Sequence, residues 1–237
     1  MGIDTSLEIK DLSICYREQI VFDHFSLSIE QNAITCVLGP SGSGKTTLLK
    51  ALAGLLPQAN GIVPNAASYI FQEPRLIPSM TALDNVAVVL SGKLKENRAF
   101  ARKYLADMEL ADAETKYPHE LSGGMAQRVS ITRGLLFDAP LLLMDEPFKG
   151  LDLALQERLI KYFIKYWEKS KKTCVFVTHS ILEALLVADR VIVLNQGAKG
   201  AEVVFDKKLT MPRERRALGE SSVDAFRSEL HDTLVNL

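Results

Sequence analysis

The stretch "AITCVLGPSGSGKTTLLKALAG", residues 33–54, contains the pattern that decides the fold. Its short apolar run at 33–38 predicts a strand, which leads directly into a glycine-rich turn. A helix is predicted after the turn, from about Lys45 to Ala53. Residues 39–46 match the pattern G-x-x-x-x-G-K-[ST] in this strand-and-helix context. The sequence therefore predicts a phosphate-binding loop at this position.

The chemistry of phosphate binding explains the residue types of this loop. Glycines let the backbone N–H groups curve around phosphate oxygens, and the N-terminus of the following helix adds a favourable potential. Lys45 can reach the β- and γ-phosphates, and Thr46 can offer its hydroxyl to Mg²⁺. The alternative is an ordinary glycine-rich turn, and the intact strand-and-helix context argues against it. The predicted nucleotide-binding residues of the loop are Gly39, Pro40, Ser41, Gly42, Ser43, Gly44, Lys45, Thr46 and Thr47.

A pair of carboxylates follows a second apolar run. "PLLLMDE", residues 140–146, reads as a strand that is covered on both faces and ends in Asp145 and Glu146. A carboxylate at the carboxyl end of such a strand can hold Mg²⁺, and its neighbour can orient or deprotonate the attacking water. We assign the metal to Asp145 and the water to Glu146, with a pair of solvated acids as the alternative. Phosphoryl transfer depends mainly on positioning and charge neutralisation, so these few groups suffice.

Strands alternate with helices along most of the chain, which predicts an α/β fold with a mostly parallel sheet. Strand-like pairs near each end of this region predict an antiparallel β addition. Thr81, Asp152 and Ser180 are predicted to cap helices. Further strands are expected at 60–63, 68–72 and 173–179, a closing hairpin at 190–206, and helices at 81–90, 93–110, 122–137, 152–167, 180–188 and 221–237.

Composition narrows the possible classes of protein. The chain has 237 residues with 28 basic and 29 acidic side chains, so its formal net charge is -1. This near-neutral balance argues against nucleic acid as a partner, since nucleic-acid binding needs a strongly basic face. No apolar run approaches the roughly 18 residues of a membrane span. The three cysteines, Cys15, Cys36 and Cys174, are predicted to be reduced core residues of a cytosolic protein.

A second glycine-rich turn raises the question of a second nucleotide. Ser122, Gly123 and Gly124 open a predicted helix and can also present N–H groups and a hydroxyl to an anion. The loop at 39–46 should already surround the phosphates of one nucleotide. The second turn therefore needs a nucleotide that is held elsewhere.

At this turn the sequence resembles the ATP-binding subunit of an ABC transporter. "LSGGMAQRVSITRG" at 121–134 resembles the signature motif of that family, "GPSGSGKTT" at 39–47 its Walker A loop, and "LLLMDEP" at 141–147 its Walker B strand. "LD" at 151–152 resembles its D-loop and "VTHS" at 177–180 its switch-histidine region. The resemblance spans roughly residues 7 to 205. It implies a P-loop ATPase core in an ATP-binding domain at 1–208, a helical subdomain at about 75–137 that carries the signature motif, and a tail at 209–237 with one amphipathic helix.

The resemblance also implies how two copies of the chain use ATP. Two subunits pack head to tail as a homodimer, and each ATP lies between the phosphate loop of one subunit and the signature turn of the other. Asp152 lies at the interface between the subunits. The residues implied to contact the partner's ATP are Leu121, Ser122, Gly123, Gly124 and Met125.

Three further site residues follow by their match to family motifs. Tyr16 is implied to stack on adenine, with a packed core tyrosine as the alternative. Gln72 is implied to sense Mg²⁺ and the membrane partner. His179 is implied to contact the γ-phosphate and to take part in catalysis with Glu146; its alternative is a structural histidine.

One stretch refines the resemblance. "FQEPRLIPSMTALDNV", residues 71–86, resembles the importer branch that serves nitrate, sulfonates, taurine and some thiamine precursors. In that branch the segment after Gln72 receives the membrane subunit, which makes Glu73, Arg75 and Leu76 candidate docking residues. The chain departs from the family at Lys149, where small residues are usual, and this lysine could modulate the interface.

The expected protein is thus an ATPase subunit, bound peripherally at the cytoplasmic face of the cell membrane. It would power a membrane importer of a small solute with ATP and Mg²⁺. Separate transmembrane permease subunits would form the channel, and a solute-binding protein would deliver the solute. The alternatives are the ATPase subunit of an ABC exporter, a soluble ABC-type ATPase that acts on DNA or the ribosome, and a P-loop kinase.

Overall fold

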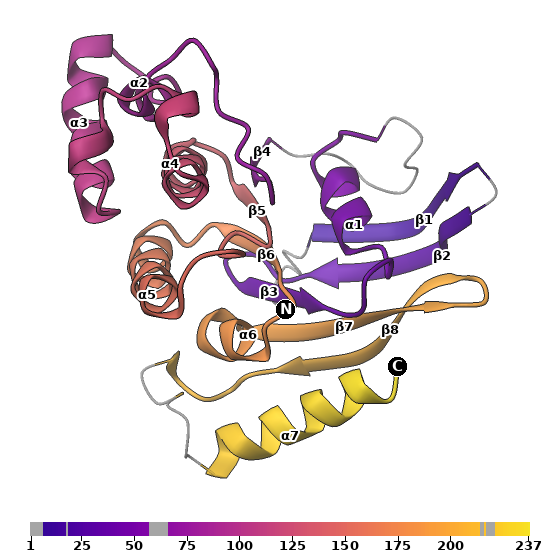
Figure 1. Ribbon diagram of the computed structural model, residues 1–237. Coiled ribbons are helices and arrows are strands. Elements are labelled where there is room, and N and C mark those ends of the chain that lie inside the picture. The colour runs from indigo at the N-terminus through magenta and orange to yellow at the C-terminus, as the bar shows by residue number, and fades with distance from the viewer. Residues whose placement is uncertain (1–6, 18, 57–65, 214–215, 217–220) are drawn as a thin grey trace, which may run out of the picture.

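A twisted parallel sheet forms the centre of the computed structural model, which describes residues 7–17, 19–56, 66–213, 216 and 221–237 (Figure 1). In this described part the sheet has six strands in the order β4-β5-β6-β3-β7-β8. All neighbours are parallel except β8, which pairs antiparallel with β7. The predicted parallel sheet and closing hairpin are therefore confirmed. The strands are β3 (Ile34–Leu38), β4 (Ala67–Ile70), β5 (Leu141–Asp145), β6 (Thr173–Val177), β7 (Arg190–Gly197) and β8 (Gly200–Lys208).

The central strands β3, β5 and β6 are buried along their whole length, because both faces of the sheet are covered. On one face, Val37 packs with α1 (Lys45–Leu52) and with the antiparallel pair β1 (Leu7–Tyr16) and β2 (Gln19–Ile29). On the other face, Cys36 packs with the helices that follow β5 and β6. The alternating side chains of β3 thus reach two different apolar clusters, as a strand inside a covered sheet requires.

The helix caps that the sequence predicts are confirmed. The Thr81 hydroxyl accepts a hydrogen bond from the Asp84 backbone N–H at 3.2 Å, at the start of α2 (Ala82–Ala87). Asp152 accepts from the Leu155 N–H at 2.9 Å, at the start of α5 (Leu153–Ser170). The Ser180 hydroxyl accepts from the Glu183 N–H at 3.2 Å, at the start of α6 (Ile181–Val187). Each cap satisfies a backbone donor that has no partner within its helix.

Helix α2 is shorter than predicted. It ends at Ala87, although its sequence stays apolar to residue 90. The side chain of Asn97, on α3 (Leu94–Asp107), donates hydrogen bonds to the carbonyls of Ala87 and Leu90. A side-chain donor from the next helix therefore satisfies carbonyls at the end of α2, which have no partner within that helix.

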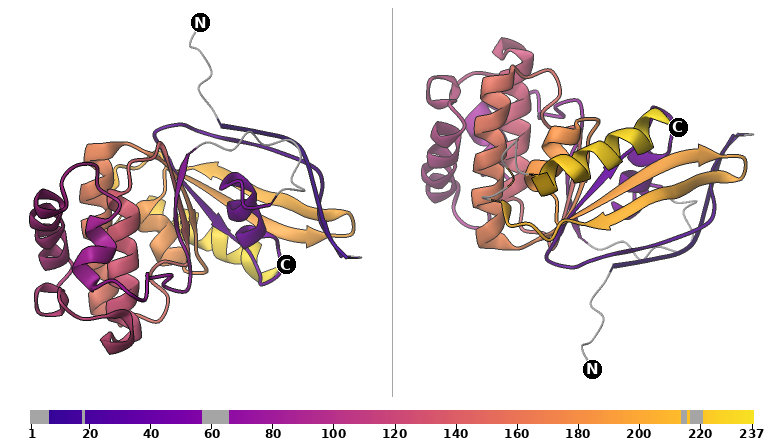
Figure 2. Two further views of the ribbon diagram at one scale, coloured as in Figure 1. Left: turned by 90° about the horizontal axis from the view of Figure 1, so that it is seen from above. Right: turned by 90° about the horizontal axis from the view of Figure 1, so that it is seen from below.

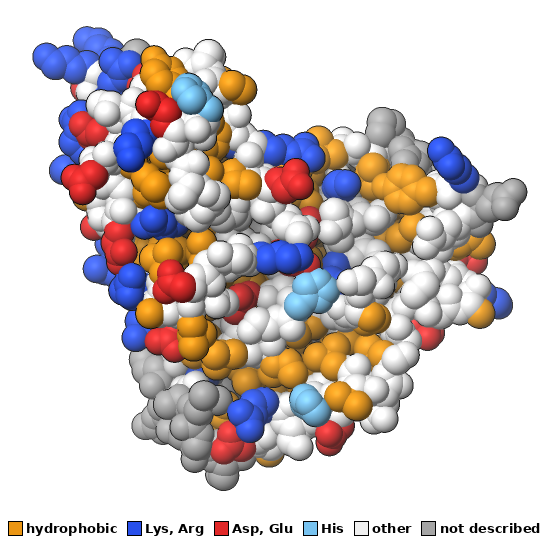
Figure 3. Space-filling model, in the orientation of Figure 1, with side chains coloured by type: hydrophobic (Ala, Val, Ile, Leu, Met, Phe, Trp, Pro, Cys, Tyr) orange, Lys and Arg blue, Asp and Glu red, His pale blue; other side chains and the backbone are white. Residues whose placement is uncertain are grey.

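Helices α2, α3 and α4 (Gly123–Leu136) gather at the end of the molecule away from β1 and β2 (Figures 1 and 2). On the face drawn in Figure 3, the Lys and Arg side chains of this helical part are interspersed with Asp and Glu. Arg98 pairs with Asp84, and Arg102 pairs with Glu114, both at 2.6 Å. This charge pattern fits a solvated helix face rather than a basic nucleic-acid surface.

The tail folds back on its own domain. Helix α7 (Ser221–Val235) buries Val223 and Leu230, and its Phe226 ring meets Phe205 of β8 edge to face. The tail thus contains one helix, which packs apolar side chains on its own domain.

Two other predictions have different outcomes. The predicted strand at 60–63 lies outside the described residues. The prediction that all three cysteines are core residues is wrong for Cys15, which is exposed next to the turn from β1 into β2 and donates to the Arg17 carbonyl. Cys36 and Cys174 are buried, as predicted.

Candidate nucleotide-binding site

The site lies where four neighbouring parallel strands end. Strands β4, β5, β6 and β3 are adjacent in the sheet and parallel, so their carboxyl ends share one edge. Shortly after them come Gln72, Glu146, His179 and the phosphate loop. Residues that are far apart in the sequence therefore meet around one cavity of about 390 Å³. Among the described residues, the cavity is lined by Tyr16, Gln19, Val21, Ser41, Gly42, Gly44, Lys45, Thr46, Thr47, Gln72, Glu146, Lys149 and His179.

The conformation of the phosphate loop requires glycine at two positions. A Cβ atom on Gly39 would lie 2.1 Å from the Leu194 carbonyl oxygen of β7, so only glycine fits there. Gly44 precedes α1 with φ 91°, a left-handed conformation that favours glycine. The turn is thus held against the sheet, while residues of the loop and the start of α1 line the cavity. A loop of this form suits the binding of phosphate groups.

Lys45 supplies the positive charge of the loop. Its ammonium donates to the carbonyls of Gly39 and Pro40 at 2.8 and 2.7 Å, and the side chain is only 6% exposed. Burial lowers the pKa of Lys45 below its usual value, although the carboxylates of Glu146 and Asp145 oppose this effect. The loop therefore holds a cation in a partly desolvated place, where its attraction for a phosphate anion is strong.

Asp145 contacts Thr46, which directly follows the loop lysine. Its Oδ1 accepts from the Thr46 hydroxyl, and its Oδ2 accepts from the Tyr69 hydroxyl, both at 3.3 Å. Burial raises the pKa of Asp145, and these two hydrogen bonds oppose the rise. The adjacent hydroxyl and carboxylate oxygens are hard ligands of the kind that Mg²⁺ prefers. The donor set at Thr46 and Asp145 therefore fits that ion.

Glu146 is held in an unusual backbone conformation. Its φ is 45°, a left-handed value that costs a non-glycine residue on the order of 1–3 kcal/mol. Its backbone N–H donates to the Val177 carbonyl at 2.9 Å, which keeps the residue at the end of β6. Its Oε1 lies 2.5 Å from His179 Nε2, and its Oε2 lies 2.7 Å from Lys149 Nζ. The carboxylate is thus presented to the cavity between two nitrogen donors.

The buried carboxyl group of Glu183 holds the loop that carries His179. Glu183 accepts hydrogen bonds from the Thr178 hydroxyl at 2.5 Å and from the Gln156 side chain. Burial raises the pKa of Glu183 despite these two donors. Gln156 lies one turn into α5 after its cap Asp152, so this cluster connects the start of α5 with the residue next to His179.

The second glycine turn lies apart from this cavity. Ser122 caps α4, and its hydroxyl accepts from the Met125 N–H at 3.3 Å. Within the described part of the chain, neither residues 121–125 nor Asp152 line the cavity. The structure thus brings together Tyr16, the loop, Gln72, Glu146 and His179, and it leaves the signature residues and Asp152 outside that cavity.

Comparisons with known proteins now identify the family. The sequence profile of the family described as "ABC transporter" matches residues 22–149. The chain is 39% identical to the aliphatic sulfonates import ATP-binding protein SsuB 1 of Pseudomonas syringae pv. tomato, over 96% of this chain and 83% of that relative. The chain belongs to the ABC transporter family. As an ABC ATP-binding subunit it binds ATP and hydrolyses it to power transport.

Other relatives agree with this identification. The subunit is 36% identical to the aliphatic sulfonates import ATP-binding protein SsuB 2 of Streptomyces avermitilis, over 91% of this chain and 87% of that relative. Among solved structures it is similar to the dimeric bacterial ABC transporter cassette MJ0796, with a TM-score of 0.74 and 29% identity. That similarity covers 86% of this chain and 99% of the other. A second dimeric structure of that cassette, bound to ADP and phosphate, gives a TM-score of 0.73.

None of the helices in the described ranges of this ABC subunit is both long and apolar enough to cross a membrane.

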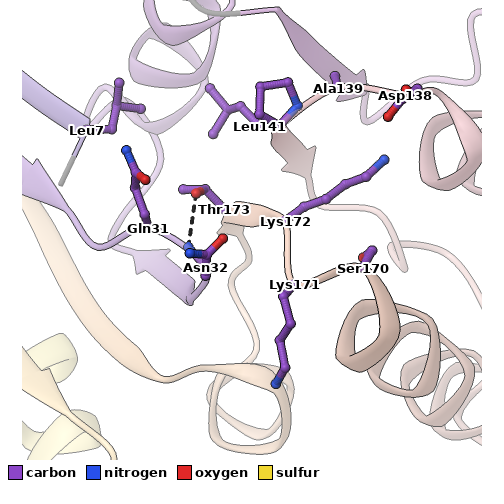
Figure 4. A pocket seen from close by; sticks show the side chains of 11 residues that line it. Leu7, Gln31, Asn32, Asp138, Ala139, Leu141, Ser170, Lys171, Lys172 and Thr173 are labelled. Carbon is purple, nitrogen blue, oxygen red and sulfur yellow. Dashed lines mark hydrogen bonds between the residues drawn. The ribbon is translucent and has the colours of Figure 1, made fainter. Parts of the chain in front are cut away.

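A second cavity, of about 400 Å³, lies at the opposite edge of the sheet, where β5 and β6 begin at Leu141 and Thr173 (Figure 4). There the Asn32 backbone N–H donates to the Thr173 hydroxyl at 3.1 Å (Figure 4). Ligands of such sheets bind at the carboxyl ends of the strands, so this cavity is not the nucleotide site.

The sequence reasoning did not find Tyr69, Gln19 and Val21. The last two line the cavity from β2, and Tyr69 reaches Asp145 from β4. Tyr69 could not be found because nothing in its neighbourhood in the sequence shows that β4 pairs with β5. The parallel register that places it beside β5 appears only in the fold.

The Tyr69→Phe variant tests whether Asp145 acts on a metal. Removing the hydroxyl takes away a donor that favours the ionised carboxylate. Loss of one such hydrogen bond should raise the Mg²⁺ concentration for half-maximal ATP turnover by about fivefold. Because it further raises the pKa of Asp145, the acid side of the pH profile should move to higher pH.

The control for Tyr69→Phe is Tyr166→Phe, which removes a hydroxyl that donates to the Leu135 carbonyl, outside the nucleotide cavity. It should leave the Mg²⁺ dependence unchanged. An equal shift in both variants would mean that the effect comes from general destabilisation and not from Asp145.

Proposed function

We propose that this ABC subunit powers the import of small organic sulfonates, working as a homodimer on separate transmembrane permease subunits. The relatives at 36–39% identity are named as aliphatic sulfonate import subunits, and they match along most of this chain. We further propose that it lies peripherally at the cytoplasmic face of the membrane, and that a solute-binding protein delivers the solute. The observation that carries the ATPase part is the meeting of the phosphate loop, Glu146 and His179 at one cavity.

In the proposed closed dimer, each ATP lies between two subunits. One subunit contributes the phosphate loop, with Tyr16 stacked on the adenine, and Gln72 and His179 near the γ-phosphate. The other contributes its signature turn, residues 121–125, from the helical subdomain at about 75–137. The exposed N–H groups at the start of α4 suit an anion, and within one chain they lie outside the nucleotide cavity. That separation supports the need for a partner. Asp152 would then lie at the interface between the subunits.

Hydrolysis in this arrangement uses few side chains. Glu146 accepts a proton from the attacking water, while Lys45 and His179 stabilise the charge that develops on the γ-phosphate. Thr46 and Asp145 would hold Mg²⁺, with Gln72 nearby, and the bound ion would supply positive charge to neutralise the phosphates. The backbone of Glu146 is fixed by its bond to Val177, so the residue already lies at the cavity before ATP binds.

The segment after Gln72 is the proposed contact with the permease. Arg75 lies over the Phe71 ring at 4.0 Å, and this ring stacks on Tyr69, whose hydroxyl donates to Asp145. The Arg133 side chain donates to the Arg75 carbonyl from α4. Packed groups thus connect the proposed metal site with the predicted docking residues Glu73, Arg75 and Leu76.

Uptake by intact cells tests the proposal. The gene would be deleted in its own organism, and cells would be restored with the wild-type chain, Glu146→Gln or the surface control Glu157→Gln. We expect uptake of radiolabelled ethanesulfonate to be lost on deletion, restored by the wild type and by Glu157→Gln, and not restored by Glu146→Gln. Unchanged uptake after deletion would contradict the sulfonate substrate. Slower efflux of a solute instead would favour the exporter alternative.

A further inference from the structure

Lys149 contacts the carboxylate that the proposed function assigns to the attacking water. The turn after β5 brings it there, since the Lys149 backbone N–H donates to the Glu146 carbonyl at 3.2 Å. This turn places the two side chains on the same side, and Lys149 Nζ lies 2.7 Å from Glu146 Oε2. Both residues line the nucleotide cavity. The lysine is therefore part of the site.

The neighbours of Glu146 make this contact unusual. Its other oxygen, Oε1, lies 2.5 Å from His179 Nε2. The other lysine near Glu146, Lys45, donates instead to the carbonyls of its own loop. Each carboxylate oxygen of Glu146 thus lies at ion-pair distance from a nitrogen atom. Lys149 provides the nitrogen near Oε2, an atom that is buried and has no hydrogen-bond partner among the described residues. An attacking water that needs Oε2 as its proton acceptor has to compete with an ammonium group.

The pair is able to open. The Glu146 side chain is 11% exposed, whereas that of Lys149 is 57% exposed. Half-exposed ion pairs contribute little free energy and are screened by salt. The next residue, Gly150, has φ 77°, and a Cβ atom added to it would meet no atom within 4 Å. The backbone of the turn is held by the bond from the Lys149 N–H to the Glu146 carbonyl, whereas the half-exposed lysine side chain can move its ammonium into solvent. A contact of this kind can delay a reaction without blocking it.

We propose that Lys149 is a positioning residue that restrains the Glu146 carboxylate and slows ATP hydrolysis until its ammonium leaves Oε2. This inference rests on the proposed role of Glu146. In this role Lys149 slows turnover and does not bind phosphate. The two roles predict different kinetic effects, because loss of a restraint on Glu146 raises kcat, whereas loss of a phosphate ligand raises KM for ATP.

The test measures steady-state ATP turnover of the full-length chain with four variants. Lys149→Ala removes the ammonium, and Lys149→Arg keeps a cation that can pair with a carboxylate. Lys161→Ala removes an exposed lysine of α5 that does not line the cavity. We expect Lys149→Ala to raise kcat by about threefold with KM for ATP unchanged, as suits an ion pair of this exposure. Lys149→Arg and Lys161→Ala should behave like the wild type.

Two further measurements sharpen the result. The ratio of kcat between Lys149→Ala and the wild type should fall towards one as salt is raised, because salt screens the pair. Glu146→Gln, the fourth variant, should remain inactive. An unchanged or lower kcat in Lys149→Ala, or a higher KM for ATP, would overturn the inference. A wild-type chain without ATPase activity, or an active Glu146→Gln variant, would instead overturn the proposed role of Glu146.

Discussion

The Glu146→Gln variant should hydrolyse ATP at least about 100-fold more slowly than the wild-type chain, since general-base catalysis contributes 10²–10⁴-fold. The amide keeps the size of the side chain and can still lie beside His179, but it cannot accept the proton of the attacking water. ATP binding should persist, because the phosphate loop and Lys45 are untouched. Steady-state phosphate release and equilibrium binding of ATP measure the two effects separately.

The same variant should accumulate as a dimer when MgATP is added. The closed dimer forms, but without hydrolysis it does not reopen. Light scattering should show the mass of a monomer without nucleotide and of a dimer with MgATP. The surface control Glu157→Gln should turn over ATP like the wild type and show no trapped dimer. Tight ATP binding without a dimer would contradict closure of the isolated subunits. A repeat with candidate permease subunits would then show whether closure needs the membrane partner or the head-to-tail arrangement is wrong.

The local parts of the site could be predicted from the sequence because neighbouring residues determine them. The pattern at 39–46 fixes a turn between a strand and a helix, and caps such as Asp152 act within three residues of their partners. The apolar run ending in Asp145 likewise identifies a covered strand. These features depend on backbone geometry and short-range hydrogen bonds, so they need no knowledge of the rest of the fold.

Contacts between distant segments could not be predicted in the same way. Tyr69 meets Asp145 only because β4 lies beside β5, and sequence patterns do not give the order of strands in a sheet. The carbonyls of Ala87 and Leu90 at the end of α2 accept hydrogen bonds from Asn97, a side chain of the next helix. Cys15 lies in an apolar strand, but its place next to the turn from β1 into β2 leaves it exposed. In each case a tertiary contact, or its lack, overrides a local preference.

The second large effect concerns the two glycine turns, and mixing inactive subunits tests how they are used. Lys45→Ala removes the ammonium of the phosphate loop, and Ser122→Arg places a bulky cation at the signature turn. Each variant alone should lose ATP turnover almost completely, because in a head-to-tail homodimer the single defect spoils both sites. Ser122 is exposed, whereas Lys45 is buried, so circular dichroism should first confirm that both variants remain folded.

Mixing the two variants in equal amounts should restore activity. In a mixed dimer one site combines both defects, whereas the other combines an intact phosphate loop with an intact signature turn. If subunits pair at random, half of the dimers are mixed and each has one good site, so turnover should recover to about a quarter of the wild-type value. The control mixes Lys45→Ala with Glu146→Gln. Both of these changes lie on the phosphate-loop side of the site, so every site keeps a defect and no activity should return. Recovery in the first mixture alone would mean that the turn at Ser122 acts on the nucleotide of the partner. No recovery in either would contradict the shared site, because a turn that serves only its own chain gains nothing from a second subunit.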